Sequence, residues 1–224
     1  PYIDPVASVL AGNAQYGVGT SSLLLARKAG QPVVVLAVVF QHSPLVLLVR
    51  RGDATQGIPG IRDLAGKRVM LEPQSDELIA YLKQEGITLD QLVQVPLGHA
   101  EHYEELIQGD VDAISAYDTY EPYYLDRAGS AYQTYSPRMG GIDFYGDNLF
   151  TTEQELKAHP QRVRAFRDAS LRGWRYAMEH PEEIADLIVA KYSQQHPRDF
   201  YRFEAQRMAP LLRADLVEVG YMNQ

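Results

Sequence analysis

The sequence predicts an α/β fold of two lobes that ends in a helical segment. Short apolar runs alternate with amphipathic segments up to residue 136, and only helical patterns follow Glu153. Two stretches that mix turn-forming, polar and aromatic residues, 40–44 and 138–148, interrupt the alternation. They indicate where the chain crosses between lobes, because hinged proteins place such segments there. The expected lobes are residues 1–44 with 146–224, and residues 45–145.

The apolar runs predict strands, and the amphipathic segments predict helices. Residues 33–40 and 45–50 are almost wholly apolar and rich in β-branched side chains, which favours buried strands. Glycines directly after most helical patterns indicate where the helices end. Strands are expected at 14–19, 33–40, 45–50, 67–72, 92–97, 111–117 and 131–136. Helices are expected at 6–10, 20–29, 76–85, 100–108 and 120–127. This alternation is typical of open parallel sheets.

The C-terminal segment has a different pattern. Val163, Phe166, Ser170, Trp174 and Met178 recur at steps of three and four residues, which predicts an amphipathic helix over 161–179. Pro160 suits the first turn of that helix. Further helices are expected at 181–191 and 199–212, and Pro210 is expected to kink or end the last one.

Composition excludes several classes of function. The 224-residue chain has a formal net charge of −8, and an acidic surface repels nucleic acid. Cysteine is absent, which excludes disulfides, thiolate metal sites and a cysteine nucleophile. The longest apolar run, 33–40, is far shorter than the roughly 20 residues that span a bilayer. No signal peptide is visible, and the chain begins at Pro1 rather than methionine, so we expect a fragment without its upstream targeting segment.

Candidate ligand contacts lie where predicted strands end, because open α/β sheets bind ligands at those ends. The first such turn holds Tyr16, Thr20 and Ser21, and we expect Thr20 or Ser21 to cap the next helix. No acid occupies the first turn of that helix, so its N–H groups could bind an anionic or carbonyl group. An ordinary capped helix explains the same pattern equally well.

Two further strand ends favour neutral or amine-bearing ligands. Gln74 and Ser75 precede a predicted helix whose first turn carries two acids, which would repel an anion. Tyr117, Asp118 and Glu121 lie in a turn crowded with tyrosines, and such side chains suit a heterocycle or an amine. The alternative for both turns is simple helix capping.

The two crossings supply three more candidates, namely His42, Asp143 and Asn148. His99 and His102 do not have the spacing of a metal motif, and we expect them to lie at the start of a helix. The sequence has neither a nucleophile elbow nor a phosphate-binding loop. We therefore expect no cofactor, no metal site and no catalytic residue.

The order of several motifs resembles the periplasmic solute-binding proteins, in the branch related to thiamine-pyrimidine-precursor synthases. The resemblance covers nearly the whole chain. It is carried by Ile3-Asp4-Pro5, Ala14-Gln15-Tyr16-Gly17-Val18-Gly19, the run from Ile61 to Val69, Gly109-Asp110-Val111-Asp112-Ala113, and Asn148-Leu149-Phe150 leading into Pro160-Gln161-Arg162-Val163. It implies a two-lobed fold of the periplasmic-binding-protein type II. It also implies an N-terminal strand–helix–strand that is absent here.

The same resemblance implies binding without chemistry. The related synthases carry a lysine and a histidine where this sequence has Gly19 and Leu23. They carry a cysteine-rich iron-binding run where this sequence has residues 141–145. A synthase-like enzyme is the alternative function, and a structural domain with a vestigial cleft is a third.

The expected function is therefore binding of a small polar organic ligand, such as a pyrimidine or an amine, held between two lobes. The expected location is periplasmic or otherwise extracytoplasmic. The expected partners are subunits of a membrane transporter of the ABC class. The alternative partner is the chain's own membrane-anchored signalling domain, a histidine kinase or a diguanylate cyclase.

Overall fold

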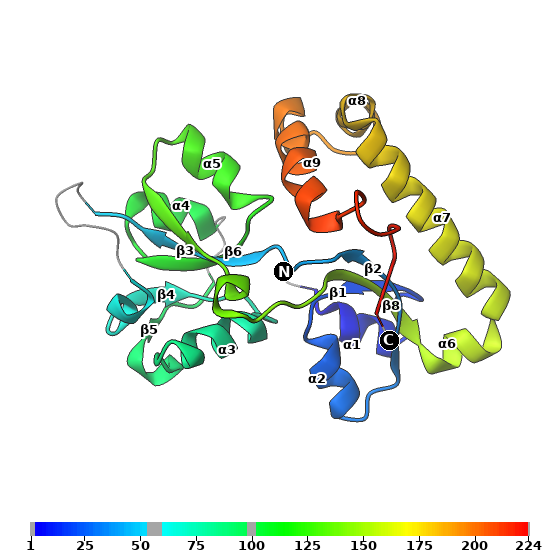
Figure 1. Cartoon of the computed structure of the whole chain (residues 1–224), viewed down its shortest axis with the longest axis horizontal. Coiled ribbons are helices and arrows are strands. Elements are labelled where there is room, and N and C mark those ends of the chain that lie inside the picture. The colour runs from blue at the N-terminus through cyan, green and yellow to red at the C-terminus, as the bar shows by residue number, and fades with distance from the viewer. Residues whose placement is uncertain (1–2, 53–59, 98–101, 224) are drawn as a thin grey trace. The chain divides into compact units, whose positions relative to one another are not determined.

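The computed structural model describes residues 3–52, 60–97 and 102–223. The chain divides into two compact units, which Figure 1 draws with their elements labelled. Unit 1 contains Pro1–Ser43 and Phe144–Gln224, and unit 2 contains Pro44–Asp143. The chain passes from one unit to the other at residues 43–44 and 143–144, inside the two turn-rich stretches of the sequence.

Unit 2 is built on a mixed five-stranded sheet. Its strands are β3 (Leu45–Arg50), β4 (Arg68–Met70), β5 (Val93–Gln94), β6 (Ala113–Tyr117) and β7 (Tyr132–Tyr135), in the order β5-β4-β6-β3-β7. Strand β4 pairs in parallel with β5 and β6, whereas β3 runs antiparallel to β6 and β7. The predicted parallel alternation is therefore confirmed for β4–β6 and wrong for β3, the strand that enters from the first crossing.

Burial on both faces explains why β3 is almost continuously apolar. Leu47 and Leu48 are both fully buried, and successive side chains of a strand point to opposite faces. Leu47 packs with Leu78 and Leu82 of α3 (Asp76–Gln84). On the other side, Leu48 packs in the cluster that holds Leu106 of α4 (His102–Gln108) and Leu125 of α5 (Glu121–Arg127). His99 and the predicted start of α4 at residues 100–101 lie outside the described residues.

Short 3₁₀ helices complete unit 2. They are η2 (Ile61–Leu64), η3 (Leu89–Gln91) and η4 (Pro137–Gly140).

Unit 1 has a three-stranded antiparallel sheet. Strand β8 (Gly146–Thr152) lies between β1 (Gly17–Gly19) and β2 (Val33–Phe40). It runs antiparallel to both neighbours. The sequence prediction missed β8, because its composition is too polar to indicate a central strand.

Hydrogen bonds from its own side chains allow this polar strand to be buried. The amide of Asn148 donates to the carbonyl oxygen of Gly19 at 3.1 Å. The hydroxyl of Thr151 donates to the carbonyl oxygen of Gln15 at 2.7 Å. Both polar side chains are thus satisfied inside the sheet, while Phe150 between them supplies the apolar packing.

The first two helices of unit 1 are short. In α1 (Pro5–Leu10) the carboxylate of Asp4 caps the helix by accepting the N–H groups of Val6 and Ala7. In α2 (Leu23–Lys28) the cap position is Ser22, so the prediction that Thr20 or Ser21 caps this helix is wrong. The hydroxyl of Thr20 instead accepts the N–H of Ser22 at 3.2 Å, which closes a tight turn before the helix.

Among the described residues, four helices follow β8: the three that the sequence predicts for the C-terminal segment, and a short one before them that it did not predict. They are α6 (Glu153–Ala158), α7 (Pro160–Glu179), α8 (Pro181–Lys191) and α9 (Arg198–Leu212). Pro210 lies inside α9, which ends two residues later. Among the described residues, no helix has the length and hydrophobicity needed to cross a membrane.

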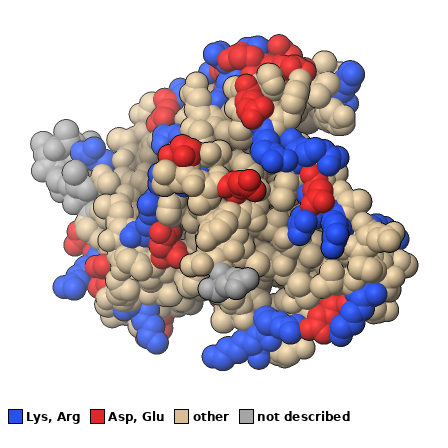
Figure 2. Space-filling view, turned by 45° about the vertical axis from the view of Figure 1, so that its right-hand side comes forward, with Lys and Arg blue, Asp and Glu red and all other residues tan. Residues whose placement is uncertain are grey.

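Ion pairs link the outer faces of α8 and α9. The guanidinium of Arg198 contacts Glu182 at 2.8 Å and also pairs with Asp186. Arg202 contacts the same Glu182 at 2.6 Å. On the face shown in Figure 2, acidic and basic side chains lie interspersed among uncharged ones.

A pair of glycine substitutions tests the packing of unit 1. A Cβ atom at Gly17 would lie 2.6 Å from the ring of Phe150, which is fully buried and cannot move aside. We expect Gly17→Ala to lower the free energy of unfolding by about 1–3 kcal/mol. Gly173→Ala is the control, because it meets open space within α7 and should stabilise the helix by about 0.5–1 kcal/mol. Urea unfolding measures both, and equal effects would contradict this packing.

Candidate functional site

A polar cluster lies in unit 2 where the parallel strands β4 and β6 end. The hydroxyl of Ser115, in β6, accepts the N–H of Glu72 at 2.8 Å and fixes the chain that leaves β4. The helices that follow, α3 and α5, begin at Asp76 and Glu121. The polar residues that start these helices therefore gather at the same edge of the sheet, as they do in ligand-binding α/β proteins.

Glu121 and His102 form the centre of this cluster. The Glu121 side chain is buried, and its carboxylate accepts the N–H of Tyr117 at 2.7 Å. Nε2 of His102 lies 2.9 Å from the Glu121 carboxylate, and Nδ1 lies 3.8 Å from that of Glu72. The imidazole thus lies between the buried carboxylate of Glu121 and the partly exposed carboxylate of Glu72, where it offsets part of the cost of burying Glu121. Sequence reasoning missed His102, because its position at the start of a helix also fits a surface residue.

The start of α3 adds a strained backbone and a buried hydroxyl. Gln74 has a positive φ of 65°, a conformation that costs energy for a residue with a side chain. Ser75 occupies the predicted cap position, but its hydroxyl does not cap the helix. That oxygen is buried and has no hydrogen-bond partner among the described residues. Buried polar atoms are nearly always bonded, so this hydroxyl is an exception that calls for an explanation.

The tyrosines of the third predicted turn pack on one another and on Tyr103 of α4. Tyr124 stacks on Tyr103 with ring centroids 4.4 Å apart and lies edge-on to Tyr123. Asp118 follows Tyr117 at the end of β6, and its N–H donates to the carbonyl oxygen of Pro44. Tyr117, Asp118 and Glu121 are thus brought together at one strand end, as the sequence predicts. Their role in binding stays a prediction.

The remaining predicted contacts are distributed over both units. Thr20 and Ser21 lie in the turn before α2, next to Gly19, whose carbonyl oxygen accepts the amide of Asn148. His42 is half-buried after β2. In unit 2, the exposed Asp143 lies 3.5 Å from Arg138. Thr20, Ser21 and Asn148 are therefore close to one another in unit 1.

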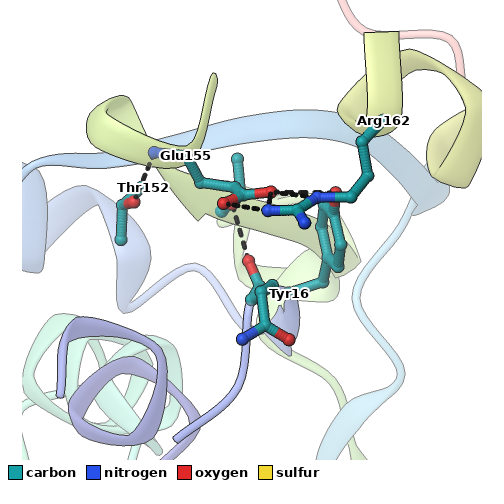
Figure 3. Close-up of polar contacts among 6 residues, drawn as sticks. Tyr16, Thr152, Glu155 and Arg162 are labelled. Atoms are coloured by element: carbon teal, nitrogen blue, oxygen red, sulfur yellow. Dashed lines mark hydrogen bonds and ion pairs between the residues drawn. The ribbon is translucent and has the colours of Figure 1, made fainter. Parts of the chain in front are cut away.

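Tyr16 belongs to a different network, shown in Figure 3. Its hydroxyl lies 3.4 Å from the carboxylate of Glu155, which also binds the guanidinium of Arg162 through two hydrogen bonds. Its ring stacks on Phe166 with centroids 3.9 Å apart. Burial, followed by the charge of Glu155, raises the pKa of Tyr16, so the hydroxyl stays protonated and donates. Tyr16 thereby joins β1 to α6 and α7.

The sequence analysis did not identify a pair of acids in unit 1. Asp147, at the start of β8, has a positive φ of 47°, and burial raises its pKa to about 6. Burial and the charge of Asp147 raise the pKa of Glu204, in α9, to about 7. These residues lie 57 positions apart in the sequence, so only the fold brings them into electrostatic contact. Among the described residues, no group of three or more His, Asp and Glu side chains is placed to bind a metal.

Comparison with known proteins identifies the family and the fold. A family model described as "NMT1/THI5 like" matches residues 1–184. No curated protein matches the chain by sequence. A solved protein from Bordetella bronchiseptica has a TM-score of 0.76 and 17% identity, over 98% of this chain and 71% of that one.

Two sulfonate-binding proteins have the same fold. The periplasmic aliphatic sulphonate binding protein SsuA from Escherichia coli has a TM-score of 0.66 and 16% identity, over 94% of this chain and 75% of that one. The alkanesulfonate-binding protein SsuA from Xanthomonas axonopodis, bound to MOPS, has a TM-score of 0.61 and 16% identity, over 90% and 69%. The chain spans 61% to 76% of the length of eight solved neighbours. The predicted fold class, α/β of the two-lobed periplasmic-binding type, is confirmed.

A double-mutant cycle tests the pairing of Glu121 with His102. We expect Glu121→Gln and His102→Gln each to lower the free energy of unfolding, because each leaves the other group buried with less compensation. The loss of unfolding free energy in the double variant should be smaller than the sum of the two single losses, by about 1 kcal/mol or more. Glu104→Gln, an exposed change on α4, is the control and should have little effect. Strict additivity in urea unfolding would show that the two groups do not interact.

The raised pKa values of Asp147 and Glu204 predict how stability depends on pH. In the folded state these groups hold protons up to about pH 6 and 7, whereas the unfolded chain releases them near pH 4. The folded protein therefore binds more protons in this range, and its stability falls as the pH rises through it. We expect the melting temperature to rise as the pH is lowered from about 8 to about 5.5. The rise should be about 2–4 °C for each kcal/mol gained in unfolding free energy.

Asp147→Asn should flatten this dependence, since the amide does not titrate. Asp110→Asn, a change of the same kind at an exposed position, should leave it as in the wild type. A melting temperature that falls on acidification in the wild type would contradict the assignment.

Proposed function

The chain belongs to the NMT1/THI5-like family, and from this premise we propose that it is a non-enzymatic solute-binding module for a small polar organic molecule. The observation that carries the proposal is the polar cluster at the ends of β4 and β6. In it Ser75 presents a buried hydroxyl that has no partner among the described residues, beside the strained Gln74. Binding sites concentrate such strain and such unsatisfied groups.

Charge indicates the class of ligand. Glu72, Glu77 and Glu121 surround this strand end, and Asp76 adds a further acid in the first turn of α3. Carboxylates accept hydrogen bonds from amino and ring N–H groups, and tyrosine faces suit flat rings. We therefore propose a ligand that bears an amine or an N–H-rich ring, a pyrimidine included.

The proposed contacts follow from the strand ends and the crossings. In unit 2 they are Gln74, Ser75, Tyr117, Asp118, Glu121 and Asp143. In unit 1 they are Tyr16, Thr20, Ser21, His42 and Asn148.

Binding without catalysis is supported by two positions of unit 1. Related synthases resemble this chain but carry a lysine and a histidine where it has Gly19 and Leu23. Leu23 is buried in the core with Val9 and Phe150. A Cβ atom at Gly19 would lie 3.0 Å from Leu23, so this backbone has little room for a longer side chain. Both positions thus serve packing.

The proposed location is extracytoplasmic, and the proposed partners are membrane subunits of an ABC-type importer. Two solved neighbours are named as components of ABC transport systems, the binding component of an import system from Staphylococcus aureus and the substrate binding protein of an amino acid transporter. Service as the sensor of a membrane-anchored signalling protein is the alternative within the same binding function.

Ligand-induced stabilisation tests the proposal directly. We expect one or more members of a panel of pyrimidines, amines and amino acids to raise the melting temperature, because a ligand that binds only the folded state stabilises it. Asp118→Asn should then weaken binding of that ligand by roughly tenfold, about 1.4 kcal/mol, in isothermal titration calorimetry.

The control is Asp110→Asn, an exposed change in the same unit, which should bind as the wild type does. No shift with any compound, or equal affinity in both variants, would count against the proposal. Turnover of a bound pyrimidine precursor with release of a new product would overturn its non-enzymatic part.

A further inference from the structure

An open cavity of about 460 Å³ lies among the C-terminal helices of unit 1. It lies among α7, α8 and α9, which Figure 1 shows beside one another. Its volume is within the range of about 300–1,000 Å³ that is usual for small-molecule sites. Most of the lining is apolar and includes Trp174, Met178, Ile184, Ile188 and Met208.

One carboxylate interrupts this apolar lining. Glu204 of α9 lines the cavity, and among the described lining residues only Tyr201, on the same helix, also ionises. Helices α7 and α8 contribute no charged side chain to the described lining. The outer acids of α8 differ, since Glu182 and Asp186 are paired with arginines. Glu204 has no such ion pair among the described residues.

Asp147 strengthens the negative potential at Glu204. Asp147 stands at the start of β8, and its charge is one of the two causes that raise the pKa of Glu204. Two carboxylates of like charge in poorly solvated surroundings destabilise each other. A cation bound at Glu204 would relieve this repulsion and would be attracted more strongly than at an exposed surface. The apolar walls meanwhile favour a hydrocarbon body.

We propose that this cavity is a second binding site, for an organic cation that joins a protonated amine to an apolar body. The amine contacts Glu204, and the apolar body contacts the side chains of α7 and α8. The site is separate from the polar cluster of unit 2. Helix α9 also lies beyond residue 184, where the match to the family model ends.

The only tryptophan of the chain gives a readout specific to this cavity. Trp174 lines it, so fluorescence excited at the tryptophan band reports on this site and not on unit 2. The probes are 2-phenylethylamine, 2-phenylethanol and phenylacetate, which have similar bodies and differ in charge. At about pH 8, where Glu204 is ionised, we expect the amine to bind at least roughly tenfold more tightly than the alcohol. Phenylacetate should bind least.

The contribution of Glu204 is tested by substitution and by pH. Glu204→Gln should reduce the affinity of the amine to that of the alcohol and leave alcohol binding unchanged, which also shows that the cavity is intact. Glu179→Gln, an exposed change on α7 outside this lining, is the matched control and should retain the preference. In the wild type, the affinity for the amine should fall as the pH drops through about 7, because Glu204 becomes protonated.

Three results would overturn the proposal. They are an amine affinity no greater than that of the alcohol, an unchanged preference in Glu204→Gln, and an amine affinity that does not fall on acidification. The pH series on the wild type decides the matter if the variant does not fold. Failure here leaves the solute-binding proposal standing, since that proposal is measured by variants of unit 2.

Discussion

A carboxylate that leaves water must be neutralised by a partner, by a proton or by a bound cation. Each unit of this protein holds acidic side chains that are wholly or partly withdrawn from water, and the two units meet the requirement differently. In unit 2 the imidazole of His102 lies against Glu121, and a backbone N–H from Tyr117 adds a hydrogen bond. In unit 1 Asp147 and Glu204 have no ion-pair partner among the described residues and retain protons to higher pH. Acids without an ion-pair partner, like the two in unit 1, are suited to binding cations.

The fold supplies the rigid framework on which these acids are held. In each unit one strand that leaves a crossing, β3 in unit 2 and β8 in unit 1, runs antiparallel between two neighbours. Strand β3 is apolar on both faces, whereas β8 uses the side chains of Asn148 and Thr151 to bond neighbouring carbonyl groups. Asp147 stands at the start of β8, so the satisfied polar strand also fixes the position of an acid.

Sequence patterns predicted most of the framework, because β2 and β3 are continuous apolar runs and the C-terminal helices have a clear helical periodicity. They did not predict β8, since a strand whose polar side chains are satisfied internally is indistinguishable from a loop in the sequence. They also predicted a parallel sheet where β3 is antiparallel, because strand direction depends on pairing partners that periodicity does not contain. The beginning of α2 was misplaced by the choice among three adjacent hydroxyl residues, of which Ser22 holds the cap position.

The candidate site was also only partly predictable from the sequence. Tyr117, Asp118 and Glu121 are neighbours in sequence, so their shared turn was visible as a cluster. His102 joins Glu121 only through the packing of α4 against α5, and Glu204 meets Asp147 only through the packing of α9. Tyr16 stood out in the sequence as an aromatic residue at a strand end, yet its ring and hydroxyl are engaged with Phe166 and Glu155. Long-range pairing of charges is thus the part of the site that local patterns do not contain.

The most direct measurement of this account is a carbon-13 NMR titration of the side-chain carboxyl groups of Asp147 and Glu204 in the folded protein. The account predicts that Asp147 titrates near pH 6 and Glu204 near pH 7. Titration of both groups near pH 4, the usual range of exposed carboxyl groups, would contradict it.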